Sequence, residues 1–364
     1  MRVAILGAGA IAYGGAAFLC REGHDPVLWS PSGGRARAIA AGEPLVATGS
    51  IEGSFRPRVA STCAEALSDA EAVLIALPAN GHKQVMDAAA PHLRPDQTVI
   101  ISSHTSFSGL YLAKLLAARG ITVPIVAWGT TVTAGRQAGD AGVTVAVVRA
   151  KVDAAVLPVS AAGPALAVCR SLFGDRFVER PDMLAIALSN LNPQNHMGIA
   201  LCNFTRMEKG ETWGQNDNIT DSVGRLLEAL DAERLAIAAA VGHTVRTIQE
   251  HYHFSFHVPP GPVGEMSRAI AARGGGGNGP TTIDTRYVLE DVPYGLLPTV
   301  LLGDLAGAPA PLHNSGIRIF SALYGRDLAA ENDILPELGI GGMSLEALKR
   351  LVREGWGDVS TPPR

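Results

Sequence analysis

The first half of the chain alternates short apolar runs with longer segments of helical periodicity. The apolar runs cover residues 2–6, 26–29, 72–77, 98–102, 124–128 and 143–148. Short runs that are apolar throughout are typical of strands buried on both faces of a parallel sheet. Because helical stretches separate several of these runs, we predict an α/β domain with a doubly wound, mostly parallel sheet.

The second half of the chain carries almost no strand signal. Apolar residues recur at helical spacing over 221–241, and shorter helices are predicted at 245–252, at 263–273 and from Pro293 to about residue 306. Residues 153–173 are also expected to form a helix, and residues 176–180 a last extended piece. We therefore expect an α/β domain over 1–181 and an all-α domain over 182–364.

A glycine motif follows the first apolar run at once. Residues 7–12 read Gly-Ala-Gly-Ala-Ile-Ala, between the predicted strand and a predicted helix. Gly7 permits the tight turn, and Gly9 lets the backbone approach a pyrophosphate at the helix N-terminus. We predict a dinucleotide-binding Rossmann domain in which Gly7, Gly9, Ala10 and Ile11 contact the cofactor, with an ordinary strand–turn–helix as the alternative.

The end of the second apolar run bears on the choice of cofactor. Sites for NAD usually place Asp or Glu here, but the segment carries Ser30, Ser32, Arg35 and Arg37. Hydroxyl and guanidinium groups suit a 2′-phosphate, so we expect NADPH to be preferred over NADH. The alternative is that the arginines are merely solvated. Pro78 follows the third run, at the sheet edge where dinucleotides lie, and is expected to contact the cofactor.

The composition of the chain limits its possible binding partners and its cellular location. The 364 residues carry 47% hydrophobic and 18% charged side chains and a net charge of −4, which argues against a nucleic-acid surface. No apolar run is long enough for a membrane span, and Met1 leads directly into a strand, so we expect a cytoplasmic protein.

The four cysteines form no CxxC pair and are expected to be reduced core residues. His82 and His104 follow predicted strands and are expected to be loop residues.

The segment 188–198 contains the candidate acid–base group. Asn192 and Pro193 predict a helix start, with Asn192 at the N-cap. His196 then falls in the first turn, where the helix dipole disfavours the imidazolium and a nearby carboxylate would favour it. A histidine in such a position is a candidate for proton transfer, and a capping or buried structural histidine is the alternative.

Two further segments change the interpretation. The glycine-rich stretch 274–279 is predicted to be a flexible loop of the kind that closes over a site. After it, Arg286 and Asp291 stand in a short charged piece that on its own is an ordinary surface segment. Tyr252 precedes the loop and is a candidate to line a substrate pocket with it.

Together these motifs resemble a known family. Asn190-Leu-Asn-Pro193 and His196, paired with Arg286-Tyr-x-x-Glu-Asp291-Val-Pro293, are similar to the signatures of the opine dehydrogenases, the octopine/nopaline dehydrogenase family. The resemblance covers the whole chain. It implies a catalytic His196–Asp291 pair, an Arg286 that grips a substrate carboxylate, and reduction of the imine formed from an α-keto acid and an amine or amino acid. The sequence Pro-Gln-Asn-His departs from the family and leaves the amine partner open.

The implied chemistry agrees with the residue types. His196 can accept a proton from the amine, Asp291 can hold the other ring nitrogen, and Arg286 can clamp a carboxylate. Asn192 and Tyr252 are the further substrate-binding candidates. No metal is expected, because no His, Cys and Asp cluster has ligand spacing.

Two other functions stay open from the sequence. One is a 2-keto or 2-hydroxy acid reductase of the glycerol-3-phosphate dehydrogenase or ketopantoate reductase type. Those families use a lysine in the helical domain, and Lys209, the only lysine between Lys151 and Lys349, looks like a solvated helix end. The other is a non-catalytic NADP(H) sensor. The expected partners are a keto acid and an amino acid or amine, and a second copy of the chain is a candidate partner in a homodimer.

Overall fold

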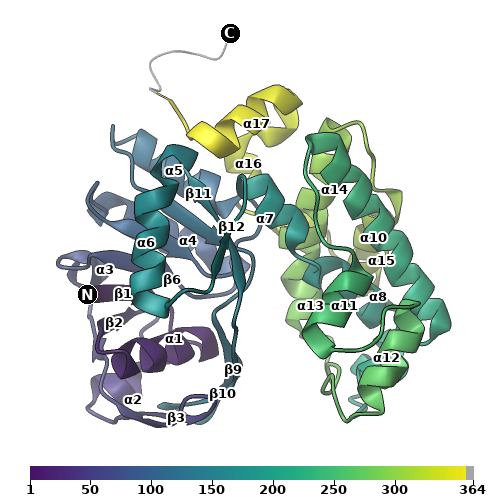
Figure 1. Ribbon diagram of the computed structural model, residues 1–364, viewed down its shortest axis with the longest axis horizontal. Coiled ribbons are helices and arrows are strands. Elements are labelled where there is room, and N and C mark those ends of the chain that lie inside the picture. The colour runs from purple at the N-terminus through teal and green to yellow at the C-terminus, as the bar shows by residue number, and fades with distance from the viewer. Residues whose placement is uncertain (358–364) are drawn as a thin grey trace. The chain divides into compact units, whose positions relative to one another are not determined.

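The computed structural model describes residues 1–357, which fold into two compact units (Figure 1). The sheet unit contains residues 1–187 and the described residues from Glu346 on, and the helical unit contains residues 188–345. The expected division after residue 181 lies six positions earlier (187 − 181) and assigns the segment 346–357 to the other unit. Among the residues described, no helix is both long and apolar enough to cross a membrane.

The main sheet has the predicted doubly wound arrangement. Its strand order is β12-β11-β8-β7-β6-β1-β2-β5, and every neighbouring pair is parallel except β11 with β8. The strands are β1 (Arg2–Leu6), β2 (Asp25–Trp29), β5 (Arg58–Val59), β6 (Ala72–Ile75), β7 (Thr98–Ile101), β8 (Ile125–Trp128), β11 (Val152–Leu157) and β12 (Phe177–Glu179). The central strands are buried on both faces, as their uninterrupted apolar sequences require.

A second, smaller sheet covers the first helix. It has the order β4-β3-β10-β9, formed by β3 (Leu45–Gly49), β4 (Gly53–Phe55), β9 (Thr133–Gln137) and β10 (Gly142–Val148). Helix α1 (Ala10–Arg21) lies between the two sheets (Figure 1). A side chain at Gly14 would meet Thr133 of the small sheet, and one at Gly15 would meet Leu74 of the main sheet. The paired glycines therefore let α1 approach both sheets.

Two sequence predictions in this unit are wrong. Residues 143–148 were expected in the main sheet, but β10 pairs with β3 and β9 in the small one. Residues 153–173 were expected to be one helix, but the segment forms β11 and then α6 (Ala162–Phe173). Pairing of β11 with β8 buries its apolar side chains and overrides the helix propensity of its alanines.

The remaining elements of the sheet unit are helices and short helical turns outside the two sheets. They are α2 (Arg37–Ala40), α3 (Cys63–Leu67), η1 (Ala79–Gly81), α4 (His82–Ala89), η2 (Ala90–His92), α5 (Ser108–Ala117), η3 (Val159–Ala161), α7 (Met183–Ser189) and α17 (Leu345–Glu354), the last two reaching across the unit boundaries. The four cysteines are free; Cys63 and Cys169 are buried as expected, whereas Cys202 is exposed.

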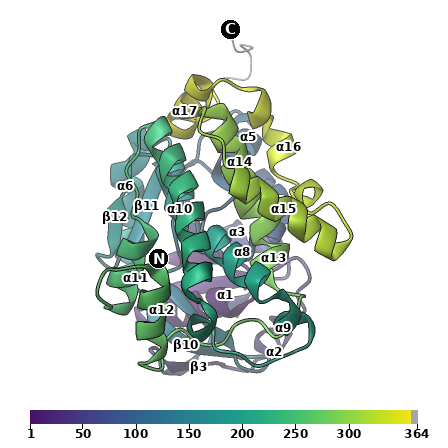
Figure 2. The same cartoon turned by 90° about the vertical axis from the view of Figure 1, so that its right-hand side faces the viewer.

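The helical unit is built around α10 (Asp221–Val241), whose bounds agree with the predicted 221–241. Figure 2 shows α10 running among its neighbours, and it packs against both α8 and α12. The other elements are α8 (Asn192–Cys202), α9 (Phe204–Glu208), η4 (Asn216–Asn218), α11 (Ile248–Phe256), α12 (Val263–Ala271), α13 (Arg286–Leu289), a π-helix (Val292–Leu296), α14 (Leu297–Leu305), α15 (Pro311–Tyr324), η6 (Ala329–Glu331), α16 (Leu335–Leu338) and η7 (Ile340–Gly342). Within the described residues of this unit, strand pairing is limited to one isolated bridge, so the all-α prediction is confirmed.

Candidate active site

Helix α8 carries His196 but begins differently from the prediction. Asn192 is its first residue and Leu191 its N-cap, so the expected N-cap at Asn192 is wrong by one position. The Asn190 side chain instead accepts a hydrogen bond from the Asn192 N–H at 3.1 Å. His196 is therefore the fifth residue of the helix, in its second turn, where the dipole of the helix terminus acts less strongly than expected.

Close packing fixes the position of α8. A side chain on Gly198 would collide with Leu227 of α10, and one on Gly295 would overlap the ring of Pro193. Such contacts need glycine, because a Cβ would push the two backbones apart. The helix that carries His196 is thus held tightly between α10 and the π-helix.

A buried polar network holds the same helix from inside the unit. The Gln194 amide donates to Asp231 at 2.7 Å, and Asp231 also pairs with Arg234 at 2.7 Å. Arg234 in turn donates to the backbone carbonyls of Leu188 and Arg246. All three network side chains are buried, so each donor and acceptor needs its partner. The sequence does not predict this network, because Gln194 lies 37 residues from Asp231 and only the fold brings the two together.

Asp291 stands where α13 passes into the π-helix. Pro298 has no N–H to offer the carbonyl of Tyr294, so the regular helical hydrogen-bond ladder cannot continue through this turn. The Asn332 side chain satisfies the carbonyl of Pro293 at 2.8 Å. Wide turns of this kind are frequent at functional sites, and here the turn directly follows the Asp291 carboxylate.

His196 and Asp291 form a close pair. Nδ1 of His196 lies 2.6 Å from Oδ2 of Asp291, and the two side chains are 14% and 5% exposed. Because an ionised carboxylate only accepts hydrogen bonds, Nδ1 carries the proton and Nε2 of the neutral ring is an acceptor. None of the residues 1–357 makes a hydrogen bond to Nε2, so this nitrogen is available for proton transfer.

The ring of Tyr287 covers one face of the His196 imidazole. The two ring centroids are 3.6 Å apart and the planes are inclined by 12°. The Tyr287 hydroxyl donates to Oε1 of Gln215 at 2.5 Å. Tyr287 stands in the second motif, but its position there does not predict a contact with His196, and nothing in the sequence singles out Gln215.

Arg286 is the first residue of α13 and points partly into solvent. Its Nε pairs with Glu290 at 3.1 Å, and its side chain is 61% exposed, whereas that of Glu290 is 11% exposed. In the part of the chain that the structure describes, no residue bonds to its two Nη atoms. The guanidinium is therefore oriented by Glu290 and keeps two nitrogens for a carboxylate.

The other two substrate candidates occupy different environments. Asn192 is exposed at the start of α8. Tyr252 is buried in the core of the helical unit, and burial raises its pKa to about 12, with a smaller lowering by the Ser267 hydroxyl and a smaller raising by Tyr287. Within residues 1–357 no hydrogen bond joins Tyr252 to the His196–Asp291 pair.

The second part of the glycine-rich stretch, residues 276–279, lies against residues 213–216, whereas Gly274 and Gly275 donate to carbonyls at the end of α12. Gln215 N donates to Gly277 O, Gly279 N donates to Trp213 O, and Gly214 and Asn278 form an antiparallel bridge. These bonds tie the predicted loop to the same segment that carries the partner of Tyr287.

In the sheet unit the glycine turn has the geometry of a pyrophosphate cradle. Gly7 has a φ of 147°, and a Cβ there would overlap the Ala76 carbonyl. Gly9 is the N-cap of α1 and has no side chain to cap the helix. The first N–H groups of the helix, at Ala10 and Ile11, therefore donate to no side-chain cap. Free N–H groups at a helix N-terminus form an anion site.

The residues after β2 surround the same turn. The Tyr13 hydroxyl donates to the Arg35 carbonyl at 2.6 Å. Nη1 of Arg35 lies 3.5 Å from the position that a Cβ on Gly9 would take. Ser30 follows β2, and its hydroxyl is buried without a hydrogen-bond partner among the described residues. Ser32 and Arg37 are exposed beyond it, and so is Pro78, which follows β6. An unsatisfied hydroxyl and a cation near a helix terminus fit a phosphorylated ribose.

His82 and His104 are not surface residues, contrary to the expectation of polar loop positions. Each is 1% exposed; His82 opens α4, and His104 follows β7. Burial lowers the pKa of His82 to about 4, against a smaller raising by the Leu77 carbonyl. Burial and then the proximity of His82 lower the pKa of His104 to about 3. Both rings are therefore neutral at physiological pH.

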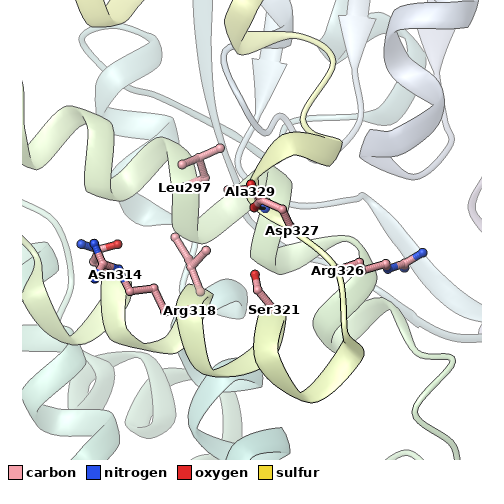
Figure 3. A pocket seen from close by; sticks show the side chains of 8 residues that line it. Leu297, Asn314, Arg318, Ser321, Arg326, Asp327 and Ala329 are labelled. Carbon is pink, nitrogen blue, oxygen red and sulfur yellow. Dashed lines mark hydrogen bonds between the residues drawn. The ribbon is translucent and has the colours of Figure 1, made fainter.

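A cavity of about 470 Å³ lies on the helical unit. Figure 3 shows the side chains that line it, which come from α14, α15 and the segment after α15. They are Leu297, Asn314, Ile317, Arg318, Ser321, Arg326, Asp327 and Ala329. The sequence-predicted site residues do not line this cavity, and residues 1–357 contain no cluster of His, Cys, Asp or Glu arranged to hold a metal.

Comparison with known proteins assigns the family. A family model described as NAD/NADP octopine/nopaline dehydrogenase, alpha-helical domain, matches residues 179–324, and one described as ketopantoate reductase PanE/ApbA matches residues 3–104. An opine dehydrogenase from Arthrobacter sp. (strain 1C) is 30% identical over 355 residues, which is 96% of this chain and 98% of that protein. The chain belongs to the opine dehydrogenase family. The resemblance inferred from the two motifs is thereby confirmed.

Solved structures agree with the fold of this opine dehydrogenase family member. Octopine dehydrogenase with NADH and L-arginine matches with a TM-score of 0.79 and 18% identity, covering 97% of this chain and 98% of that one. Yersinopine dehydrogenase with bound NADP⁺ matches with a TM-score of 0.74 and 17% identity, covering 95% and 99%. The ketopantoate reductase model matches only within the sheet unit, whereas the octopine/nopaline model matches most of the helical unit.

Proposed function

We propose that the protein is an NAD(P)H-dependent opine dehydrogenase that condenses an α-keto acid with the amino group of an amino acid or amine. The keto acid and the amine lose water to give an imine, and reduction of its C=N bond gives a secondary amine, an N-(carboxyalkyl)amino acid. The observation that carries the proposal is the His196–Asp291 pair, 2.6 Å apart and with Nε2 available, in a chain of this family.

His196 would act as the acid–base group. A protonated amine cannot attack a keto carbon, so a base must first take its proton, and Nε2 of the neutral imidazole is such a base. Asp291, on Nδ1, stabilises the imidazolium that results. The same proton can then assist the loss of water.

Arg286 would hold the carboxylate of the keto acid. Its guanidinium is always charged, and Glu290 holds Nε, so the two Nη atoms can form a bidentate pair with a carboxylate. Asn192, exposed at the start of the same helix as His196, is the candidate for contact with the amine substrate. Tyr252 is the further candidate to line the substrate pocket, and its hydroxyl stays protonated because burial raises its pKa to about 12.

The sheet unit would hold the cofactor, with NADPH preferred. Gly7, Gly9, Ala10 and Ile11 suit the pyrophosphate, and Pro78 would contact the dinucleotide at the end of β6. Ser30, Ser32 and Arg35 suit the 2′-phosphate, because no acid stands after β2 to bind a free 2′-hydroxyl. When bound, the cofactor supplies the hydride that reduces the C=N bond.

The alternative is reduction of the keto acid alone, as in ketopantoate reductases. Such enzymes rely on a lysine in the helical domain, and Lys209 is an exposed residue at the C-terminal end of α9, which disfavours this function.

The two functions differ in what NADPH oxidation requires. We expect oxidation only when a keto acid and an amine are both present, measured with pyruvate, oxaloacetate and 2-oxoglutarate crossed with a panel of amino acids. Equal rates with the keto acid alone would establish the simple reductase instead. Tight NADPH binding with no oxidation under any pairing would identify the non-catalytic sensor.

A further inference from the structure

The stacked ring of Tyr287 restricts how the His196 side chain can turn. With the planes 12° from parallel and the centroids 3.6 Å apart, the imidazole cannot rotate about its bond to Cβ without colliding with the phenol ring. Rotation by half a turn would exchange the ring edges and move Nδ1 away from Asp291. The stack therefore restricts the rotation of the imidazole that would break the 2.6 Å hydrogen bond to Asp291.

Tyr287 is itself held at its far end. Its hydroxyl donates to Oε1 of Gln215 at 2.5 Å, across 72 residues of sequence. The Gln215 backbone N–H donates to the Gly277 carbonyl at 3.0 Å. The side chain of Asn216 lies where a Cβ on Gly276 would have to be, so this close pairing needs a glycine. The glycine-rich stretch thus supports the segment that anchors Tyr287.

We propose that Tyr287 is a positioning residue: it fixes the plane of the His196 imidazole so that Nδ1 stays on Asp291 and Nε2 alone meets the substrate, with Gln215 holding Tyr287 in place. The effect of Tyr287 on turnover rests on the proposed function, whereas its effect on the orientation of the His196 ring does not. The stack also closes one face of the imidazole. Because the lone pair of Nε2 lies in the ring plane, the amine has to donate its proton in that plane.

Packing alone does not account for these contacts. Tyr287 is half-buried and packs against the core of the helical unit, but burial alone fixes neither the plane of its ring nor the direction of its hydroxyl. Its hydroxyl and its ring have separate partners, Gln215 and His196, and the two contacts fix both ends of the side chain. Arg286 and Asp291, on either side in the chain, belong to the candidate site, so one short segment supplies the carboxylate clamp, the ring cover and the acid partner.

The first test uses the ligand-free protein and needs no turnover. With ¹⁵N-labelled histidine, the wild-type protein is expected to show His196 as a single tautomer, protonated at Nδ1, with that proton shifted strongly downfield by Asp291. Tyr287→Leu removes the ring, and we expect mixed tautomers and loss of the downfield proton. Tyr287→Phe keeps the stack but loses the bond to Gln215, so it should weaken the signal less.

The second test uses turnover. We expect Tyr287→Leu to lower kcat by about 10- to 100-fold, the usual cost of a misplaced catalytic group, while the KM for NADPH stays unchanged. Tyr287→Phe and Gln215→Leu remove the same hydrogen bond, so the double variant should be no worse than either single one. Gln215→Glu keeps an oxygen that accepts from the Tyr287 hydroxyl. Unlike Gln215→Leu, it should therefore show the wild-type tautomer of His196.

A matched control is Tyr111→Phe, which removes a hydroxyl bonded to Asp87 at 2.5 Å in the sheet unit and should change neither readout. If Tyr287→Leu folds and keeps both the Nδ1–H tautomer and kcat, the positioning role is refuted. If the tautomer changes but even the wild-type protein does not turn over keto acid with amine, the positioning role stands and the proposed function fails.

Discussion

At the scale of single residues, the partner of each nitrogen sets the chemistry of His196. Asp291 occupies Nδ1, the Tyr287 ring occupies one face, and the described residues leave Nε2 without a hydrogen bond. A histidine bonded through both nitrogens to the protein would be structural. One that presents a single accepting nitrogen, with a carboxylate behind it, is suited to take a proton and hold it as imidazolium.

The first prediction separates this pair from the substrate clamp. His196→Ala should lower kcat by about 10²- to 10⁴-fold, because a positioned acid–base group contributes roughly that much. Asp291→Asn should lower it too, since an amide cannot stabilise the imidazolium. Arg286→Ala should instead raise the KM for the keto acid and affect kcat less. Steady-state kinetics with both substrates measures all three, and near-normal turnover of His196→Ala would show that this histidine is structural.

The second prediction concerns the cofactor. Exchanging Arg35 and Arg37 together for Ala should weaken NADPH, which carries the 2′-phosphate, and leave NADH nearly unchanged. Fluorescence titration of both cofactors measures the effect, with Arg136→Ala on the small sheet as the control for a lost exposed charge. Equal weakening of the two cofactors would contradict the phosphate role.

How much of the site the sequence predicts depends on how local each contact is. His196 could be named from its place near a predicted helix start, and Arg286 and Asp291 because their segment resembles a signature of the opine dehydrogenases. The contact between Tyr287 and Gln215 could not, because it joins segments 72 residues apart (287 − 215) that only the fold brings together. The hydrogen bond between Gln194 of α8 and Asp231 could not be predicted for the same reason.

At the scale of secondary-structure elements, small residues decide how precisely α8 is held. Gly198 and Gly295 let α10 and the π-helix approach it closely. The helix that carries His196 therefore has little freedom to shift.

The third prediction follows from this packing. Gly295→Ala places a methyl group in the ring of Pro193, which should destabilise the helical unit by about 1–3 kcal/mol, the usual cost of overpacking. Because Pro193 opens the helix that carries His196, kcat should fall as well. Gly342→Ala is the control, since a Cβ there meets no atom. Thermal unfolding and kinetics measure both effects, and unchanged values for Gly295→Ala would contradict the packing account.

Elements with a long hydrophobic period were predicted well. Segments whose structure depends on pairing with a distant strand were predicted poorly. The period of α10 extends over its whole length, and its bounds were predicted. Residues 152–157 contain helix-favouring alanines, yet pairing with β8 makes them a strand. Residues 143–148 read correctly as a strand, but nothing in their sequence says which of two sheets they join.

At the scale of the whole molecule, buried histidines link stability to pH. His82 and His104 have pKa values of about 4 and about 3 in the folded protein, below the ordinary value of 6.5. The unfolded chain therefore binds protons first as the pH falls below 6.5, so these residues cost no stability above that pH and destabilise the fold increasingly below it.

The fourth prediction tests this dependence. A variant with His82→Gln and His104→Gln keeps a donor or acceptor near each Nε2 position but does not titrate. Its midpoint of thermal unfolding should fall less than that of the wild-type protein between pH 7 and pH 5. His92→Gln, at an exposed position, is the control. Parallel curves for the double variant and the wild type would refute the role of the buried pair.

The homodimer expected from the sequence remains a prediction. The π-helix and α14 bury Tyr294, Leu296 and Leu302. Leu312, Ile319 and Leu323 of α15 are exposed instead, and sedimentation analysis of the purified protein would measure whether a second copy covers them.

The central claim is that hydride reaches a carbon that has become bonded to nitrogen. The most direct measurement supplies NADPH deuterated at the transferred position, a keto acid and an amino acid, and analyses the products by mass spectrometry. The predicted product is a secondary amine with the mass of the two substrates joined with loss of water and reduced, carrying the deuterium on the former keto carbon. It should be nearly absent with His196→Ala. A deuterated 2-hydroxy acid, formed whether or not the amino acid is present, would contradict the account.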